Sequence, residues 1–461
     1  MLQPLSEQLR AFFPAGTAAE LRAQLSRSRG VTMVSGNLVG NARSEASGVS
    51  ARVWQRGVCG FSSEAELSED AARRVLIAAS ENAAFMDRRA PKGLSPLPAA
   101  PRGTKHFDRN ISDPTQKQYI DFLRPLDEYI TSHCKNLQSR TLVASADSME
   151  KQLLTADALS GSSMMERSYI YVIMSAETAS GAPVELFLPI GGLGTFDKNF
   201  TDPALLYEKI DGLYAKLMQK REGIYPDAGV QTVILGGELS GMVAHEAVGH
   251  TVEADLVLGG SVAGPCLGKQ VASEKVSMVD FANEALGKPT PLPVFLDDEG
   301  IEATDATLID HGVLVGYMNN RESAAHFGQK PCGNARAYAF SDEPLIRMRN
   351  TAILPGTDKL EDMIAATEHG YYLIDTNNGQ ADTTGEFMFG VCMGYEIVNG
   401  KLGRALLDTT ISGVAFEMLK TVDMVSDELV WVSSGFCGKK QPMPVGLGGP
   451  AIRCKVTMGG R

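Results

Sequence analysis

The segment from His245 to His250 reads His-Glu-Ala-Val-Gly-His, and these residue types could hold and use a metal ion. Imidazoles are common metal ligands, and Glu246, directly after the first histidine, could accept a proton from a water molecule. On an ideal α-helix, side chains at i and i+4 lie nearly together, whereas those at i and i+5 are rotated by about 140°. The five-residue spacing therefore fits one metal ion only if the helix is distorted.

A π-bulge would supply that distortion. Its i→i+5 hydrogen bond inserts one residue into the helix and returns the two imidazoles to one side. Gly249 lies inside the interval and could ease a bulge or a break in the helix. Two histidines five residues apart are, however, more often unrelated surface or core residues. The spacing alone leaves both interpretations open.

A catalytic zinc usually has three protein ligands and a free position for water, whose pKa it lowers towards neutrality. Two cysteines near the C-terminus compete for the third position. Cys437 lies in a glycine-containing segment, Ser-Ser-Gly-Phe-Cys-Gly, where backbone freedom suits a ligand. Cys454 lies in a segment that alternates like a strand and suits a packed residue. The residues themselves favour Cys437.

Two acidic residues follow the second histidine. Glu253 and Asp255 come three and five residues after His250. Either could be a metal ligand, could orient an imidazole by a hydrogen bond, or could belong to a solvated helix end.

The composition describes an ordinary soluble globular chain of 461 residues, long enough for two or three domains. A net charge of −12 and the lack of a dense basic run argue against nucleic-acid binding. No apolar run is long enough for a transmembrane helix, and the N-terminus does not read as a signal peptide. Seven scattered cysteines suggest a reducing compartment, so we expect a cytoplasmic protein with no membrane partner.

The chain reads as an α+β protein of two domains. Residues 1–224 are expected to form an N-terminal mixed domain of helices and sheet strands. Its expected helices are at 5–13, 17–28, 68–89, 116–136 and 203–221. Residues 225–461 are expected to form a largely antiparallel β domain that carries the His245–His250 helix, with a hairpin turn at Asn399-Gly400.

The longer segment Gly-Glu-Leu-Ser-Gly-Met-Val-Ala-His-Glu-Ala-Val-Gly-His-Thr-Val-Glu-Ala-Asp-Leu resembles the signature of the TldD/PmbA family of metallopeptidases, in its TldD branch. The resemblance continues through FLDDEGIEATDATLIDHGVLVGYMNNR, GNARAYAFSDEPLIRMRNT and FCGKKQPMPVGLGGP, and covers at least residues 230–461. So many blocks in the same order are far more specific than the six-residue motif.

The resemblance implies a zinc-dependent peptidase that hydrolyses unfolded or small peptides. It assigns zinc to His245, His250 and Cys437, because Cys437 lies in the Cys-Gly-Lys segment that the family uses. It makes Glu246 the catalytic glutamate. It leaves Glu253 and Asp255 with a supporting role around the metal.

The resemblance also implies a dimer, either of two identical chains or with a PmbA/TldE-like paralogue, and a peptide held as an extended strand. The segment 377–387 is a plausible loop on the substrate side, with Asn378, Gly379, Gln380 and Asp382 as substrate-binding residues. An ordinary Gly/Asn/Asp turn is an equally good explanation for this segment. The rival function is a peptide-binding, non-catalytic subunit of a TldD–TldE-type complex. A nucleic-acid-associated modulator is a second rival, against which the acidic charge argues.

Overall fold

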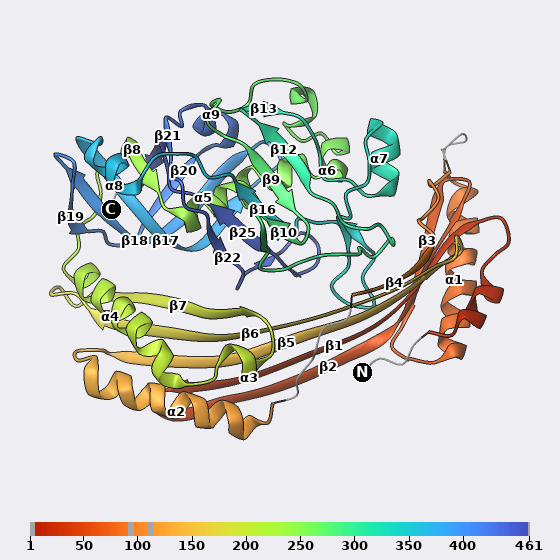
Figure 1. Ribbon diagram of the computed structural model, residues 1–461, viewed down its shortest axis with the longest axis horizontal. Coiled ribbons are helices and arrows are strands. Elements are labelled where there is room, and N and C mark those ends of the chain that lie inside the picture. Colours follow the sequence, from red (N-terminus) through yellow and green to blue (C-terminus); the bar gives the residue numbers. More distant parts are fainter. Residues whose placement is uncertain (1–4, 91–95, 108–113, 460–461) are drawn as a thin grey trace.

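The computed structural model describes residues 5–90, 96–107 and 114–459. It is a strand-rich mixture of helices and sheets, and the expected α+β class is confirmed. A long, curved N-terminal sheet lies beneath the C-terminal half of the chain (Figure 1). Within the described ranges, no helix has the length and apolar character needed to cross a membrane.

The N-terminal sheet has the strand order β3-β2-β1-β5-β6, and β6 also pairs with β7 and β4. All of its pairings are antiparallel except that of β4 with β6. Its strands are β1 (Ala18–Val34), β2 (Asn37–Gln55), β3 (Val58–Glu64), β4 (Gly103–Phe107), β5 (Ser139–Thr155), β6 (Leu159–Glu177) and β7 (Pro183–Leu193).

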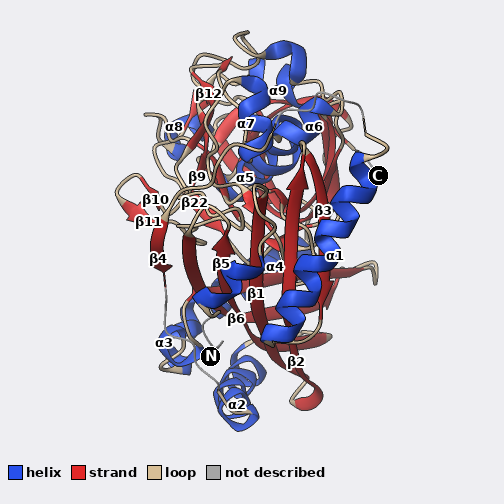
Figure 2. Cartoon of the chain, turned by 90° about the vertical axis from the view of Figure 1, so that its right-hand side faces the viewer, coloured by secondary structure: helices blue, strands red, loops and turns tan. Residues whose placement is uncertain are grey.

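Helices cover the outer side of this sheet and one of its ends. The longer ones are α1 (Glu69–Asp87), α2 (Gln116–His133) and α4 (Tyr207–Arg221), and the short ones are η1 (Glu7–Phe12), α3 (Phe196–Asn199) and η2 (Pro203–Leu206). Helix α1 runs along β3 and β2 (Figure 2). Its first turn is capped by Ser68, which accepts the N–H of Ala71, and α2 begins with a capping box at Thr115 and Gln118.

The prediction of a helix over residues 17–28 is wrong, because this segment belongs to β1. Leu21 and Leu25 are spaced as on a helix, but β1 pairs with β2 on one edge and with β5 on the other. Residues 19–25 are all buried, so the strand does not show the alternation that identifies a half-buried strand. The helices expected at 68–89, 116–136 and 203–221 are present within a few residues.

The C-terminal half contains two further sheets, in which the pairings are antiparallel except those of β16 with β25 and of β17 with β8. One consists of β8 (Gly229–Leu235), β17 (His369–Ala381), β18 (Glu386–Val398), β19 (Lys401–Ala405), β20 (Thr409–Val414), β21 (Met424–Val425) and β26 (Ile452–Met458). The other consists of β9 (Met278–Phe281), β12 (Ala306–Asp310), β13 (Val313–Leu314), β16 (Asn350–Ile353), β22 (Val430–Val432) and β25 (Gly446–Gly449). The hairpin turn at Asn399-Gly400 is confirmed, with φ values of 52° and 73°.

The remaining C-terminal elements are short. The strand pairs are β10 (Glu284–Ala285) with β11 (Lys288–Pro289), β14 (Ala335–Arg336) with β15 (Leu345–Ile346), and β23 (Phe436–Cys437) with β24 (Met443–Pro444). The helices are α5 (Gly237–Met242), η3 (Val243–Gly249), η4 (His250–Val252), α6 (Ala254–Leu258), η5 (Gly264–Cys266), α7 (Arg321–Phe327), α8 (Leu360–Ala365) and α9 (Ala415–Lys420).

Buried charges join the two halves of the chain. Arg52 on β2 contacts Glu20 on β1 at 2.6 Å and Glu299 from the C-terminal half at 3.1 Å. Arg321, at the start of α7, contacts Glu20 at 2.8 Å. The boundary after residue 224 stays a prediction; in the structure it falls between α4 and β8.

Candidate metal centre

The candidate metal centre is built on a short helical segment that follows β8. The strand ends at Leu235, and α5 starts at Gly237. Small residues let this segment pack closely on its neighbours: a Cβ on Gly249 would lie 2.2 Å from the Met348 sulfur and 2.9 Å from the Ala244 carbonyl oxygen. Glycine at this position therefore allows the close contact that fixes the helix.

The helix is distorted as the histidine spacing requires. Residues Val243–Gly249 form a π-helix, η3, and the backbone N–H of His250 donates to the carbonyl of His245, five residues earlier. Such a bond adds one residue to the turn, so the two histidines return to one side of the helix. The π-bulge is thus confirmed, and a break at Gly249 is excluded.

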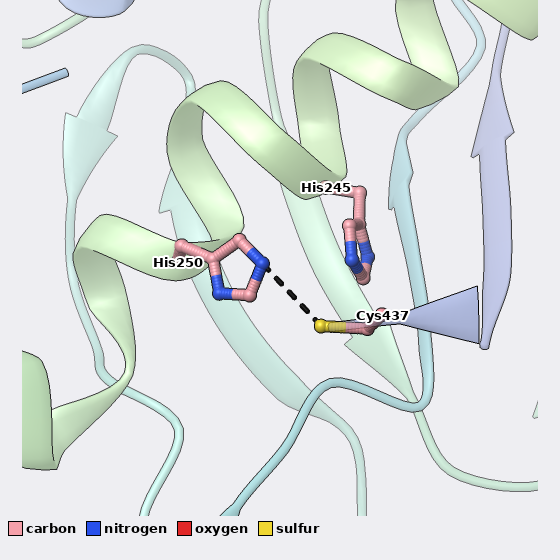
Figure 3. Close-up of side chains that lie close together, drawn as sticks. All are labelled: His245, His250 and Cys437. Carbon is pink, nitrogen blue, oxygen red and sulfur yellow. Dashed lines mark hydrogen bonds between the residues drawn. The ribbon is translucent and has the colours of Figure 1, made fainter. Parts of the chain in front are cut away.

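The side chains of His245, His250 and Cys437 converge on one point (Figure 3). One potential ligand atom from each lies within 4.8 Å of the others. The Sγ of Cys437 is 3.4 Å from Nε2 of His250. Cys437 comes from β23, 187 positions further along the chain than His250.

The electrostatics of this cluster favour a thiolate. Burial alone would raise the pKa of Cys437, but the imidazoles of His245 and His250 beside the sulfur lower it to about 3. Burial would likewise lower the pKa of His250, but the Glu253 carboxylate and the Cys437 sulfur raise it well above its usual value. A thiolate is the form of cysteine that binds metals.

The residues fit a metal ion. His245 is 1% exposed, and within the described ranges neither of its ring nitrogens has a hydrogen-bond partner. A buried imidazole without partners is costly unless something else occupies its lone pair. Two imidazoles and a thiolate are ligands that zinc prefers.

Glu246 lies beside both histidines. Its carboxylate oxygens are 3.5 Å from Nε2 of His250 and 3.9 Å from Nε2 of His245, and its side chain is 22% exposed. The glutamate therefore borders the cluster and remains open to solvent, where it could meet a water molecule.

The two other acids after the motif have supporting positions. Glu253 is fully buried and accepts a hydrogen bond from Nδ1 of His250 at 2.8 Å, which leaves Nε2 facing Cys437. Asp255 contacts Lys439 at 2.7 Å, and Lys439 also contacts Glu253 at 3.2 Å. Neither acid belongs to the converging group of His245, His250 and Cys437.

Lys439 is the residue whose role the sequence does not reveal. Its side chain is only 8% exposed and lies among the residues around the candidate metal centre. Its position two residues after Cys437 is the sole signal in the sequence.

Cys454, the competing cysteine, lies elsewhere. It is on β26, paired with Val233 of β8, and packs into the C-terminal core. Burial raises the pKa of its thiol. It is a packed thiol and is absent from the converging group.

The four predicted substrate-binding residues lie on one hairpin. Asn378, Gly379 and Gln380 belong to β17 and pair with β18, and Asp382 starts the turn between the two strands. The Asp382 carboxylate accepts hydrogen bonds from the backbone of Thr384 and Glu386, and thereby stabilises this turn. Asn378 and Gln380 are exposed.

The outer edge of β17 lies beside α5, whose Glu238 accepts the N–H of Thr376 at 3.0 Å. β17 pairs with β8 only at Tyr371–Leu373, and among the described residues no other strand covers the rest of this edge. β17 also contacts η3. A Cβ on Gly379 would lie 3.2 Å from the sulfur of Met242, the last residue before η3.

Comparison with family models gives two matches. Residues 228–460 match the PmbA/TldA metallopeptidase C-terminal domain, and residues 19–83 match PmbA/TldA metallopeptidase domain 1. The chain belongs to the PmbA/TldD family of metallopeptidases. The family resemblance of the motif segments is thus confirmed.

Relatives agree with this assignment. A metalloprotease from Methanothermobacter thermautotrophicus is 29% identical, with 96% of this chain and 95% of that protein aligned. A zinc metalloprotease TldD homolog from Saccharolobus solfataricus is 36% identical over 53% of this chain. With that protein and with a metalloprotease TldD homolog from Buchnera aphidicola, the alignment spans about half the length of the relative, 54% and 49%.

Solved structures share the fold along almost the whole chain. A candidate modulator of DNA gyrase from Thermotoga maritima has a TM-score of 0.76 at 17% identity, with 96% of each chain covered. TldE from Thermococcus kodakarensis has a TM-score of 0.71 at 16% identity, with 97% of this chain and 98% of that chain covered. At these identities the likeness concerns the fold alone.

Proposed function

We propose that this chain is a zinc-dependent peptidase that hydrolyses unfolded or small peptides. His245, His250 and Cys437 would hold the zinc. The observation that carries the proposal is the convergence of two imidazoles and a low-pKa thiol beside the carboxylate of Glu246. The Saccharolobus relative is named a zinc metalloprotease, which supports zinc as the metal.

In a tetrahedral zinc site, ligand atoms bonded at about 2.0–2.3 Å lie roughly 3.3–3.7 Å apart. The ligand atoms lie within 4.8 Å of one another, so the side chains would close in slightly around an ion. A zinc ion bound there would polarise the peptide carbonyl and acidify water. Glu246 would take the proton of the attacking water and pass it to the leaving amine. Glu253, by accepting the Nδ1 proton of His250, would keep Nε2 free as a ligand.

The peptide would bind as an added strand on the part of the β17 edge, beyond Leu373, that no described strand covers. Backbone hydrogen bonds would supply the affinity, which suits a peptidase with little sequence preference. Asn378, Gly379 and Gln380 would line this edge, and Asp382 would act through the turn that it stabilises. The functional unit would be a dimer, either of two copies or with a PmbA/TldE-like paralogue.

The deciding experiment is the metal content of the purified chain after zinc reconstitution, with Cys437→Ala as the test and Cys454→Ala as the matched control. We expect about one zinc per chain in the wild type and in Cys454→Ala, and a large loss in Cys437→Ala. A wild type that takes up no zinc would overturn the proposal. Zinc binding without cleavage of any unfolded peptide, alone or with a paralogue, would favour the non-catalytic subunit.

A further inference from the structure

A fully buried arginine holds the turn that follows Cys437. Arg347 comes directly after β15 and is 0% exposed. One terminal nitrogen of its guanidinium donates to the carbonyl of Cys437 at 2.8 Å, and the other donates to the carbonyl of Gln441 at 2.8 Å. A single planar group thus joins both ends of the turn 437–441.

The turn has few backbone supports of its own: the Gln441 N–H donates to the Lys439 carbonyl at 2.6 Å, and Cys437 pairs with Met443. The strands around it, β23 and β24, are two residues each. Lys440 adopts a left-handed backbone with φ of 56°, a conformation that costs a non-glycine residue roughly 1 kcal/mol. Gly438, next to Cys437, adds further freedom. The position of the Cys437 sulfur therefore depends on tethers from outside the turn.

Arg347 and the nearby Arg349 differ in the groups that their guanidinium groups contact. Arg349 forms an ion pair with Asp280 at 2.8 Å and also donates to the carbonyls of Cys332 and Thr304. Within the described ranges, Arg347 has no carboxylate partner, and its terminal nitrogens donate to the two carbonyls of the turn. A buried cation without a counter-ion is costly, so a purely structural role would be served better by a neutral side chain.

We infer that Arg347 is a positioning residue for Cys437, and that it sets the affinity of the metal centre by fixing where the thiolate lies. The inference rests on the proposed zinc site. Arginine suits the task because its rigid fork can donate two hydrogen bonds at once, which lysine cannot reproduce. Without the fork, the Cys437 carbonyl loses its donor and the turn relaxes, so the third ligand is no longer preorganised.

A second tether acts on the same turn from the other side. The Gln441 side chain accepts the N–H of Tyr338 at 2.8 Å and donates to the carbonyl of Glu343 at 2.9 Å. Removing this side chain loosens the turn without disturbing a buried charge. Gln441→Ala is therefore a second test that does not share the folding risk of an Arg347 variant.

The experiment uses the full chain with zinc or Co²⁺, and compares wild type, Arg347→Lys, Gln441→Ala and Arg349→Lys. Zinc affinity is measured by competition with a chelator. The Co²⁺ form reports the metal–sulfur bond through its thiolate charge-transfer absorption, with Cys437→Ala as the zero reference. We expect Arg347→Lys to lower zinc affinity about 10–100-fold and to weaken the charge-transfer band. Gln441→Ala should also lower the zinc affinity and weaken the charge-transfer band, but to a smaller extent. The folded Arg349→Lys protein should have the zinc affinity and the charge-transfer band of the wild type.

Wild-type affinity and band intensity in a folded Arg347→Lys chain would overturn the inference and leave the zinc site standing. If Arg347→Lys does not fold, wild-type zinc affinity and band intensity in Gln441→Ala would overturn the inference instead. Absence of Co²⁺ and zinc binding in the wild type would overturn the proposed function itself, which distinguishes the two failures.

Discussion

Lys439 lies between the two segments that carry the ligands, and its ammonium group is 3.2 Å from the carboxylate of Glu253. Glu253 in turn accepts the Nδ1 proton of His250, and Lys439 lies two residues after Cys437. The lysine also contacts Asp255 at 2.7 Å and donates to the carbonyl of Ile346 at 3.0 Å. One buried cation therefore ties the Cys437 turn to the helix that presents the histidines.

Lys439→Met should weaken metal binding and destabilise the fold. The substitution leaves Glu253 as a buried carboxylate without its cation, which costs about 3 kcal/mol when a buried pair loses one member. It also removes the link that sets the distance between the two ligand segments. We expect zinc affinity to fall by about 10–100-fold, as for other groups that orient ligands.

The measurements are chelator competition for zinc and urea unfolding. Lys440→Gln is the matched control, because Lys440 is the neighbouring lysine and is exposed. A Lys439→Met chain with the zinc affinity of the control would show that the ion pair does not organise the centre.

Glu246→Gln should separate hydrolysis from metal binding. The amide has nearly the same shape but cannot accept a proton from water, so kcat should fall by at least about 100-fold. The zinc content should stay at that of the wild type, because His245, His250 and Cys437 are unchanged. The assay follows cleavage of an unfolded peptide with zinc measured on the same sample. Activity near the wild-type level would remove Glu246 from the mechanism.

Glu238 gives the chain a dependence of stability on pH. This glutamate opens α5 and accepts the N–H of Thr376 at 3.0 Å. Burial, and next the charge of Asp375, raise its pKa from 4.5 to about 7. The folded state therefore prefers the protonated carboxyl, and ionisation in the unfolded chain begins at lower pH. The contribution of the protonated Glu238 carboxyl to the free energy of unfolding is fully present below pH 4.5 and is lost between about pH 4.5 and 7.

Glu238→Gln should abolish that loss, because the amide stays neutral and its oxygen can still accept the Thr376 N–H. The shift from 4.5 to about 7 corresponds to roughly 3 kcal/mol. Between pH 5 and 8, urea unfolding of the wild type should therefore lose up to about 3 kcal/mol relative to the variant. Parallel pH profiles for the two chains would mean that Glu238 is ionised in the folded state throughout this range.

Gly249→Ala should strain the end of the π-helix. The added methyl group would overlap the Met348 sulfur and crowd the Ala244 carbonyl, so the chain must shift locally. Overpacking of this kind costs about 1–3 kcal/mol. Because His250 is the next residue, we also expect weaker zinc binding.

Gly212→Ala is the control for this substitution. Gly212 lies within α4, and a Cβ there meets no atom within 4 Å. Alanine is the better helix former, so this variant should gain roughly 0.5–1 kcal/mol. Thermal unfolding of both variants gives the comparison. A Gly249→Ala chain as stable as wild type would show that Met348 moves aside freely.

The sequence by itself determined the elements whose residues interact locally. The caps of α1 and α2 and the hairpin turn at Asn399-Gly400 follow from residue type over a few positions, whereas the spacing of His245 and His250 offered the π-distortion as one of two interpretations. The sequence led to the wrong prediction of a helix at residues 17–28, because the hydrophobic pattern of a strand buried on both faces does not differ from that of a helix.

The tertiary structure decided which distant residues meet. The segment around Cys437 favours this cysteine over Cys454 as a ligand, but only the fold places the Cys437 sulfur 3.4 Å from His250. The same holds for Lys439 with Glu253 and for Arg347 with the Cys437 carbonyl. These contacts join segments some 90 to 190 residues apart, and no local propensity encodes them. They form because packing of the C-terminal sheets fixes the separation of the segments, and burial then makes an unpaired charge or carbonyl costly.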